Sequence, residues 1–218
     1  DRHLMKLAIV VPAYNEEKTI AKTVSGIRDF ADVIVVDDCS KDQTSQQAES
    51  AGAQVVRHET NKGYDGALNT GVLAAFERGY THVITFDADG QHDPSNIPLF
   101  VAAFERGDQL VIGIRPHKQR ISETLFAGYS MLRYQVLDPL CGMKGYAMAH
   151  FGEIGAFDTL GSTGTELMFR YLKKGLQYSQ ISIRMHERDD GSPRFGSLWR
   201  ANKRILSSLK AIVRLDLQ

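Results

Sequence analysis

The segment ITFDADGQHDP, residues 84–94, combines a buried strand with a dense acidic cluster. The apolar run ends at Phe86, and three aspartates, a glutamine and a histidine follow between Asp87 and Asp93. Like charges at this spacing repel each other unless something positive lies between them. The segment therefore predicts a buried strand that ends at a binding site for a positive ligand.

Short β-branched runs alternate with helical patterns on either side of this segment, which is typical of a parallel sheet covered by helices on both faces. Ligands of such sheets bind beyond the carboxyl ends of the strands. The polar stretches PAYNE, DDCS, DADGQHD and IRPHK follow predicted strands, so we expect them at one edge. The predicted strands are 7–11, 33–37, 53–58, 82–87 and 108–115, with helices at 16–30, 42–52, 64–79 and 93–107.

The pattern changes after Arg115. This half predicts helices at 121–137, 165–175 and 197–215, a turn and short strand within 138–148, a strand at 177–187 and a loop at 188–196.

Composition narrows the class of protein. The 218 residues hold 26 Lys and Arg against 26 Asp and Glu, which gives no indication of a nucleic-acid partner. Cys39 and Cys141 lie far apart, so we expect neither a disulfide framework nor a zinc site, and a cytoplasmic location. We also expect no signal peptide and no membrane-spanning helix, which needs ~20 apolar residues.

Asp87, Asp89 and Gln91 alternate along an extended segment and can face one pocket. Carboxylate and amide oxygens suit Mg²⁺ or Mn²⁺. A calcium EF-hand is excluded because Pro98 occupies the position that requires glutamate. The alternative is a cluster that caps the next helix, and we assign that role to Asp93.

Two further strand ends carry candidate ligands. Asp37 and Asp38 are able to bind a base or ribose or to form an Asx-turn, and we favour a ligand role for one of them. In PAYNEE, residues 12–17, Tyr14 offers a ring and Glu16 an acceptor, although the segment could also cap a helix.

The glycine-rich stretch NKGYDGALNTG, residues 61–71, lacks the ending of a P-loop and the spacing of a dinucleotide fingerprint. We therefore predict a tight passage from strand to helix, without ATP hydrolysis or NAD binding. Arg115, Arg188 and Arg194 are candidates for binding phosphate, because arginine forks match its oxygens, and the alternative for each is a solvated charge.

Four motifs resemble, in the same order, the blocks of family 2 inverting glycosyltransferases, which have the GT-A fold. These motifs are VVPAYNE, VIVVDDCS, NKGYDGALNTG and DADGQHDP. RDDGSPR (188–194) and DPLCGM (138–143) resemble segments of the dolichyl or polyprenyl phosphate mannose and glucose synthases. In the synthase segment that corresponds to residues 188–194, an arginine and a lysine six positions apart hold the donor diphosphate. Here Arg194 replaces the lysine, and Cys141 replaces a serine of the second segment.

The resemblance implies one GT-A (Rossmann-like) domain over residues 1–218, with 7–115 as the nucleotide-sugar half and 116–218 as a smaller acceptor-side half that ends in a basic helix. It also implies the roles of site residues. The nucleoside would contact Pro12, Tyr14, Glu16, Val36 and Asp38. Asp87 would lie near the ribose and the donor sugar, and Ala88 would also bind the donor. The metal would bind to Asp89 and Gln91, and the phosphates to Arg115, Arg188 and Arg194.

The implied reaction is metal-assisted inverting transfer of a hexose from GDP-mannose or a UDP-sugar to a polyprenyl or dolichyl phosphate, with Asp89 and Arg188 as catalytic residues. A phosphate acceptor is already an anion and requires no strong base. If the acceptor is instead a sugar hydroxyl of a surface polysaccharide, Asp138 and Glu166 are the candidate bases. A catalytically silent binding domain is the third alternative, and the set of Asp87, Asp89 and Arg188 speaks against it.

The basic C-terminal helix has two interpretations. It either contacts the cytoplasmic face of a membrane as a peripheral anchor or packs on the domain. Its predicted apolar face contains Leu198, Ile205, Leu209, Ile212 and Val213, with Arg200, Lys203, Arg204 and Lys210 around it.

Overall fold

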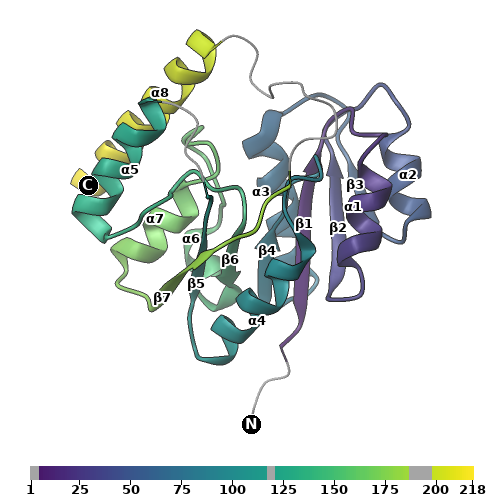
Figure 1. The fold of residues 1–218 in the computed structure, drawn as a ribbon, viewed down its shortest axis with the longest axis horizontal. Coiled ribbons are helices and arrows are strands. Elements are labelled where there is room, and N and C mark those ends of the chain that lie inside the picture. Colours follow the sequence, from purple (N-terminus) through teal and green to yellow (C-terminus); the bar gives the residue numbers. More distant parts are fainter. Residues whose placement is uncertain (1–4, 117–120, 187–197) are drawn as a thin grey trace.

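A computed structural model describes residues 5–116, 121–186 and 198–218. Its centre is a seven-stranded sheet in the order β3-β2-β1-β4-β6-β5-β7 (Figure 1). All neighbouring strands are parallel except β6, which is antiparallel to both β4 and β5. The strands are β1 (Leu7–Ala13), β2 (Asp32–Asp37), β3 (Gln54–Arg57), β4 (His82–Thr85), β5 (Leu110–Ile114), β6 (Lys144–Ala147) and β7 (Tyr178–Ser182).

Helices cover both faces of the sheet, and the alternation of side chains along each strand divides the core in two. Ala8 and Val10 of β1 belong to one apolar cluster with α3, α5, α7 and α8, whereas Ile9 and Val11 belong to the other with α1, α2 and α4. The helices are α1 (Ile20–Ile27), α2 (Thr44–Ser50), α3 (Gly63–Glu77), α4 (Ile97–Glu105), α5 (Ile121–Tyr134), α6 (Phe151–Ile154), α7 (Glu166–Lys173) and α8 (Leu198–Leu217), with 3₁₀ turns η1 (Pro94–Asn96) and η2 (Met148–His150).

This architecture confirms the expected α/β fold with a mainly parallel sheet. The six parallel strands point the same way, so the polar stretches after β1, β2 and β4 lie at one edge together with Arg115, which follows β5, as predicted. Asp93 caps η1, because its carboxylate accepts a hydrogen bond from Ser95 N at 2.8 Å.

Several elements differ from the sequence-based prediction, and three of these differences lie in the sheet or in the helix after β4. The strand expected at 177–187 is shorter, since β7 pairs with β5 only over Tyr178–Ser182. The helix expected at 93–107 starts as a 3₁₀ turn, with the α-helix beginning at Ile97. The short strand expected within 138–148 enters the middle of the sheet, where it separates β4 from β5.

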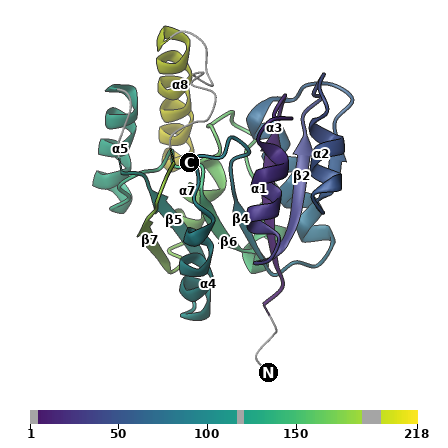
Figure 2. The same ribbon diagram turned by 45° about the vertical axis from the view of Figure 1, so that its right-hand side comes forward.

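Helix α8 lies beside α5 (Figures 1 and 2) and packs its apolar face on the domain. Ile205, Ile212 and Leu215 are buried in the same cluster as α5 and α7. Tyr134 also donates a hydrogen bond to the Asp216 carboxylate at 2.6 Å, which fixes the end of the helix. Packing on the domain is thus the interpretation that the structure supports for this apolar face. Among the helices of the described residues, none has the length and apolar content needed to cross a membrane.

Candidate active site

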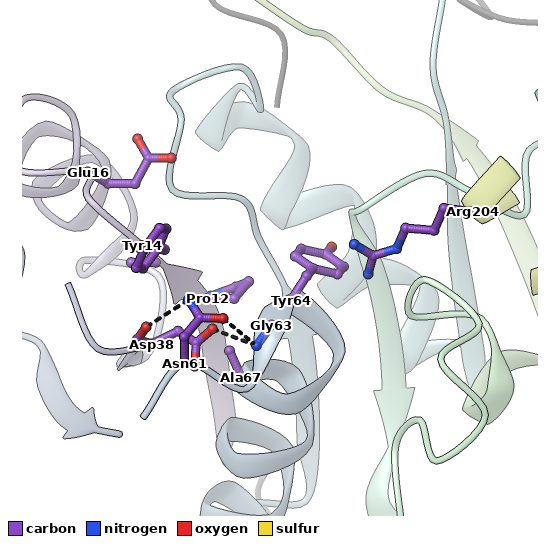
Figure 3. Close-up of a pocket in the computed structure, with 10 residues that line it drawn as sticks. Pro12, Tyr14, Glu16, Asp38, Asn61, Gly63, Tyr64, Ala67 and Arg204 are labelled. Carbon is purple, nitrogen blue, oxygen red and sulfur yellow. Dashed lines mark hydrogen bonds between the residues drawn. The ribbon is translucent and has the colours of Figure 1, made fainter. Parts of the chain in front are cut away.

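A cavity of about 400 Å³ opens at the carboxyl edge of β1 and β2, next to the start of α3 (Figure 3). Four parts of the chain enclose it: the end of β1 with the segment after it, Asp38 directly after β2, the passage from β3 into α3 with the first turns of that helix, and one side chain of α8. The lining residues are Pro12, Ala13, Tyr14, Glu16, Asp38, Asn61, Gly63, Tyr64, Ala67 and Arg204.

Asp38 is held rigidly at the wall of this cavity. Its carboxylate accepts hydrogen bonds from the backbone N–H groups of Lys62 and Gly63, both at 2.7 Å, and lies 2.7 Å from Nδ1 of His58. Gly63 has φ +77°, a conformation that favours glycine, and the turn there directs both N–H groups toward Asp38. The glycine-rich stretch therefore does form the tight passage that we predicted, and it also builds the cavity.

Asp37, in contrast, is an interior structural residue. It is fully buried and accepts hydrogen bonds from Ser40 N, from Ser45 Oγ and from the Arg57 guanidinium. Of the two adjacent aspartates, only Asp38 lines the cavity.

Six of the residues expected to bind the donor divide into two groups. Pro12, Tyr14 and Glu16 line the cavity together with Asp38, and the Tyr14 ring is 45% exposed. Val36 and Ala88 have no exposed surface and do not line the cavity. In this arrangement neither residue presents side-chain or backbone surface to a ligand.

The acidic segment after β4 borders the cavity through Tyr64, whose hydroxyl donates to Asp87 Oδ1 at 3.3 Å. His92 organises this segment. The Asp87 N–H donates to His92 Nδ1 at 3.2 Å, so the ring proton of a neutral His92 is on Nε2, which faces Asp87 Oδ2 at 3.8 Å. His92 also packs edge-on against Phe86, and it therefore holds Asp87 in place.

Asp89 is buried, and its Oδ1 accepts a hydrogen bond from Gln91 N at 3.1 Å, which keeps the two residues together. In the described part of the chain, no group of three or more His, Cys, Asp or Glu side chains is arranged for a metal ion. Mg²⁺ is commonly held by one or two carboxylates, with water and substrate phosphates as the other ligands. The hard oxygen donors of Asp87, Asp89 and Gln91 fit such an ion chemically.

Gly142 lies against the Asp87 carboxylate and leaves no room for a side chain. A Cβ at this position would lie 2.5 Å from Asp87 Oδ2. The backbone here is fixed, because Thr85 Oγ1 donates to Gly142 O at 2.7 Å and the buried Lys144 Nζ donates to Cys141 O at 2.6 Å. A substitution would therefore displace Asp87 rather than the strand.

We predict that Gly142→Ala lowers the rate of the expected sugar transfer roughly 100-fold, the effect of a misplacement of about 1 Å in an active site. The measurement is the steady-state rate, with the melting temperature as a check on folding. Gly128→Ala is the matched control, because a Cβ at Gly128 meets nothing within 4 Å. A Gly142→Ala variant as active as Gly128→Ala would show that the position of Asp87 is unimportant.

Arg115 is engaged by carboxylates of the protein itself. Its guanidinium forms a fork with Asp138, with Nε to Oδ2 and Nη2 to Oδ1 both at 2.8 Å, and Nη2 also donates to Glu123 at 3.0 Å. Burial opposes ionisation of Asp138, but the hydrogen bonds and charge of Arg115 outweigh it and hold the pKa of Asp138 below its usual value. Asp138 is therefore a weak base, and Arg115 has a structural partner where we expected a phosphate.

Glu166 is equally committed to internal contacts. Its side chain is 1% exposed, accepts a hydrogen bond from Leu160 N at 3.0 Å and pairs with Arg170 at 2.7 Å. These contacts hold the loop before α7. Arg188 and Arg194, the other expected phosphate ligands, lie outside the described residues.

The structure adds lining residues that we did not assign from the sequence. Asn61, Tyr64 and Ala67 follow a predicted strand, so the rule that ligands bind at strand ends could have found them. Arg204 gave no local signal, because its place depends on how α8 packs against the rest of the domain.

Comparison with known proteins places this site in a family. The family model described as glycosyl transferase family 2 matches residues 8–153. An uncharacterised protein of Methanocaldococcus jannaschii is 37% identical over 199 residues, which cover 82% of this chain and 81% of that protein. The undecaprenyl-phosphate mannosyltransferase of Micrococcus luteus is 29% identical over 211 residues, or 86% of each chain.

A third relative is the UDP-N-acetylglucosamine–dolichyl-phosphate N-acetylglucosaminyltransferase of Methanococcus voltae, 38% identical over 108 residues that cover 41% of this chain and 43% of that protein. Among solved structures, glucosyl-3-phosphoglycerate synthase of Mycobacterium tuberculosis in complex with Mn²⁺ and UDP-glucose superposes with a TM-score of 0.76. The superposition covers 95% of this chain and 79% of that one, and its 22% identity shows the shared fold alone.

The fold and the ordered motifs around the cavity agree with this result, and the expected GT-A architecture is confirmed. Since the family model covers residues 8–153 and a relative is 37% identical over most of both chains, the protein belongs to glycosyl transferase family 2 and is a glycosyltransferase.

Proposed function

We propose that this enzyme transfers a hexose from a nucleotide diphosphate sugar to a polyprenyl phosphate, with inversion and with Mg²⁺ or Mn²⁺ as cofactor. The observation that carries the proposal is the cavity that begins at Tyr14 and Asp38 and reaches the acidic segment through the bond from Tyr64 to Asp87. A nucleoside bound at Tyr14 and Asp38 would direct its diphosphate toward the acidic segment.

The properties of relatives support the donor and the cofactor. The mycobacterial synthase of the same fold has been crystallised with UDP-glucose and Mn²⁺. In the present chain, Asp89 and Gln91 would hold the ion, with Asp87 beside it. Once bound, the ion would neutralise charge on the leaving diphosphate. The Tyr14 ring would cover one face of the base, and Asp38 would accept hydrogen bonds from the nucleoside.

The state of the two candidate bases favours a phosphate acceptor. Asp138 is paired with Arg115, and Glu166 is held by Leu160 N and Arg170, so neither carboxylate is placed to deprotonate a hydroxyl. An acceptor phosphate is anionic already and attacks the anomeric carbon without a base. The names of the relatives from Micrococcus and Methanococcus, which act on undecaprenyl and dolichyl phosphate, point the same way.

A lipid acceptor requires the enzyme to contact a membrane surface, and the exposed side of α5 is suited to that contact. Its exposed side includes Ile121, Leu125 and Leu132, which are 82%, 57% and 90% exposed and lie on one side of the helix. Arg133 of α5 and Lys210 of the neighbouring α8 are also exposed, and their charge complements anionic lipids. We place the peripheral contact here, rather than on the buried apolar face of α8.

The test is a transfer assay with radiolabelled GDP-mannose, UDP-glucose and UDP-N-acetylglucosamine, with Mn²⁺ or EDTA, and with undecaprenyl phosphate in anionic vesicles. We expect label in the organic phase, dependence on the metal, and sedimentation of the protein with the vesicles. Transfer to an aqueous product would indicate a hydroxyl acceptor instead. A wild-type protein that releases no nucleoside diphosphate would overturn the enzymatic proposal.

A further inference from the structure

Helix α8 places one basic side chain in the cavity. Arg204 lines the cavity opposite the nucleoside end, and its guanidinium is directed toward Tyr64 (Figure 3). Tyr64 in turn donates to Asp87 at the start of the acidic segment. Arg204 therefore lies at the end of the cavity where a diphosphate or an acceptor phosphate would be located.

The charge of the lining makes this position significant. Glu16 and Asp38 contribute carboxylates to the cavity, and the acidic segment adds more next to it. Among the lining residues in the described part of the chain, Arg204 is the one with a positive charge. A phosphate in this cavity would be repelled by the carboxylates and attracted by Arg204.

Asp65 orients the guanidinium from the first turn of α3. Arg204 Nη2 lies 3.2 Å from Asp65 Oδ2, and the Arg204 side chain is 39% exposed whereas that of Asp65 is 13% exposed. Burial and the nearby charge of Asp158 raise the pKa of Asp65, and Arg204 offsets this only in part. The ionised Asp65 is thus less favourable in the folded than in the unfolded protein, which argues against a pair selected for stability alone.

We propose that Arg204 binds a phosphate group of the substrates and that Asp65 is its positioning residue. The inference rests on the proposed function and adds to it a phosphate-binding side chain from helix α8. The guanidinium fork matches phosphate oxygens, and its attachment to Asp65 limits its freedom before the ligand arrives. The phosphate belongs either to the donor diphosphate or to the lipid acceptor.

The experiment compares Arg204→Gln, Arg204→Lys and Asp65→Asn with the wild type. Calorimetric titrations in Mn²⁺ use inorganic pyrophosphate, UDP and GDP, with uridine and guanosine as ligands that lack phosphate. The KM for undecaprenyl phosphate is measured in parallel. Arg214→Gln is the matched control, since Arg214 is an exposed arginine of the same helix.

For Arg204→Gln we expect a roughly 10- to 100-fold loss of affinity for the phosphate-bearing ligand, which corresponds to the contribution of a hydrogen bond to a charged group. Weaker binding of pyrophosphate and nucleotides, with nucleoside binding unchanged, assigns Arg204 to the donor. A higher KM for undecaprenyl phosphate with unchanged nucleotide binding assigns it to the acceptor. Arg204→Lys should lose less affinity than Arg204→Gln. Asp65→Asn should weaken the binding of the same ligand without lowering the melting temperature at neutral pH.

An Arg204→Gln variant with wild-type affinity for pyrophosphate and nucleotides and a wild-type KM would overturn this inference, while sugar transfer by that variant would leave the proposed function intact. Conversely, pyrophosphate binding that depends on Arg204 in a protein that transfers no sugar would refute the function and keep the phosphate site. Equal losses in melting temperature for Arg204→Gln and Asp65→Asn, with no change in binding, would reduce the pair to a structural contact.

Discussion

Replacing Asp89 by asparagine should lower the transfer rate at least about 1000-fold, because the variant lacks the charge that would hold the metal against the leaving diphosphate. The fold should persist. Asparagine retains the side-chain oxygen that accepts the hydrogen bond from Gln91 N, so the turn has the same internal contact. The measurement is the steady-state rate at saturating donor over a range of Mn²⁺ concentrations, with the melting temperature recorded for each protein.

Asp93→Asn is the matched control from the same acidic segment. Asp93 accepts a hydrogen bond from Ser95 N and caps η1, a role that asparagine also fulfils. We therefore expect its rate to stay within about twofold of the wild type, since a surface substitution of this kind changes stability by roughly 0.5 kcal/mol or less. An Asp89→Asn variant with the rate and Mn²⁺ dependence of Asp93→Asn would show that the metal is bound elsewhere or is not required.

Replacing Arg115 by methionine should destabilise the protein by roughly 3–5 kcal/mol, the cost of leaving buried charges without their partner. The side chains of Asp138 and Glu123 are 3% and 5% exposed, and both contact Arg115. The measurement is the free energy of unfolding from denaturation in urea at pH 7.5. Arg106→Met is the control, because Arg106 is 61% exposed and lies 3.9 Å from Asp108, a pair worth less than about 1 kcal/mol.

The effect of pH separates this explanation from a loss of packing. In the wild type the pKa of Asp138 is lowered, so its contribution is present above the pKa of the unfolded state, about 3.9, and is lost only as the pH falls through the folded value. In Arg115→Met, burial without the guanidinium should raise the pKa of Asp138. Protonation then relieves the buried charge, and the deficit relative to the wild type should shrink between pH 7.5 and 5.5. A deficit that is the same at both pH values, or no larger than that of Arg106→Met, would refute the buried network.

The sequence predicted the sheet because its signals are local. Apolar runs such as residues 82–87 are bounded by helical periods and polar turns within a few positions, and in a parallel sheet those turns must meet at one edge. For the same reason Asp87, Asp89 and Gln91 could be grouped, since five consecutive positions bring them together whatever the rest of the chain does. The cap at Asp93 needed only Ser95, two residues away.

Contacts between distant parts of the chain could not be found in this way. Asp138 is 23 residues from Arg115 in the sequence, and nothing near either residue indicates that they form a fork with each other rather than with substrates. Likewise, only packing could show that β6 enters the sheet antiparallel between β4 and β5. These pairings depend on which surfaces of the whole domain exclude water together. The sequence could therefore offer Asp138 only as a candidate base and Arg115 only as a candidate phosphate ligand, whereas the structure shows that the two side chains bind each other.

By itself, then, the sequence determined the α/β class, the edge of the sheet at which the cavity opens and the acidic segment beside that cavity. Tertiary structure alone decided that Asp38 rather than Asp37 lines the cavity, that the apolar face of α8 is buried, and that Arg204 lines the cavity beside Tyr64. The physical reason is range: periodicity, capping and turn chemistry act over a few residues, whereas burial and ion pairing are fixed only when remote segments pack against one another.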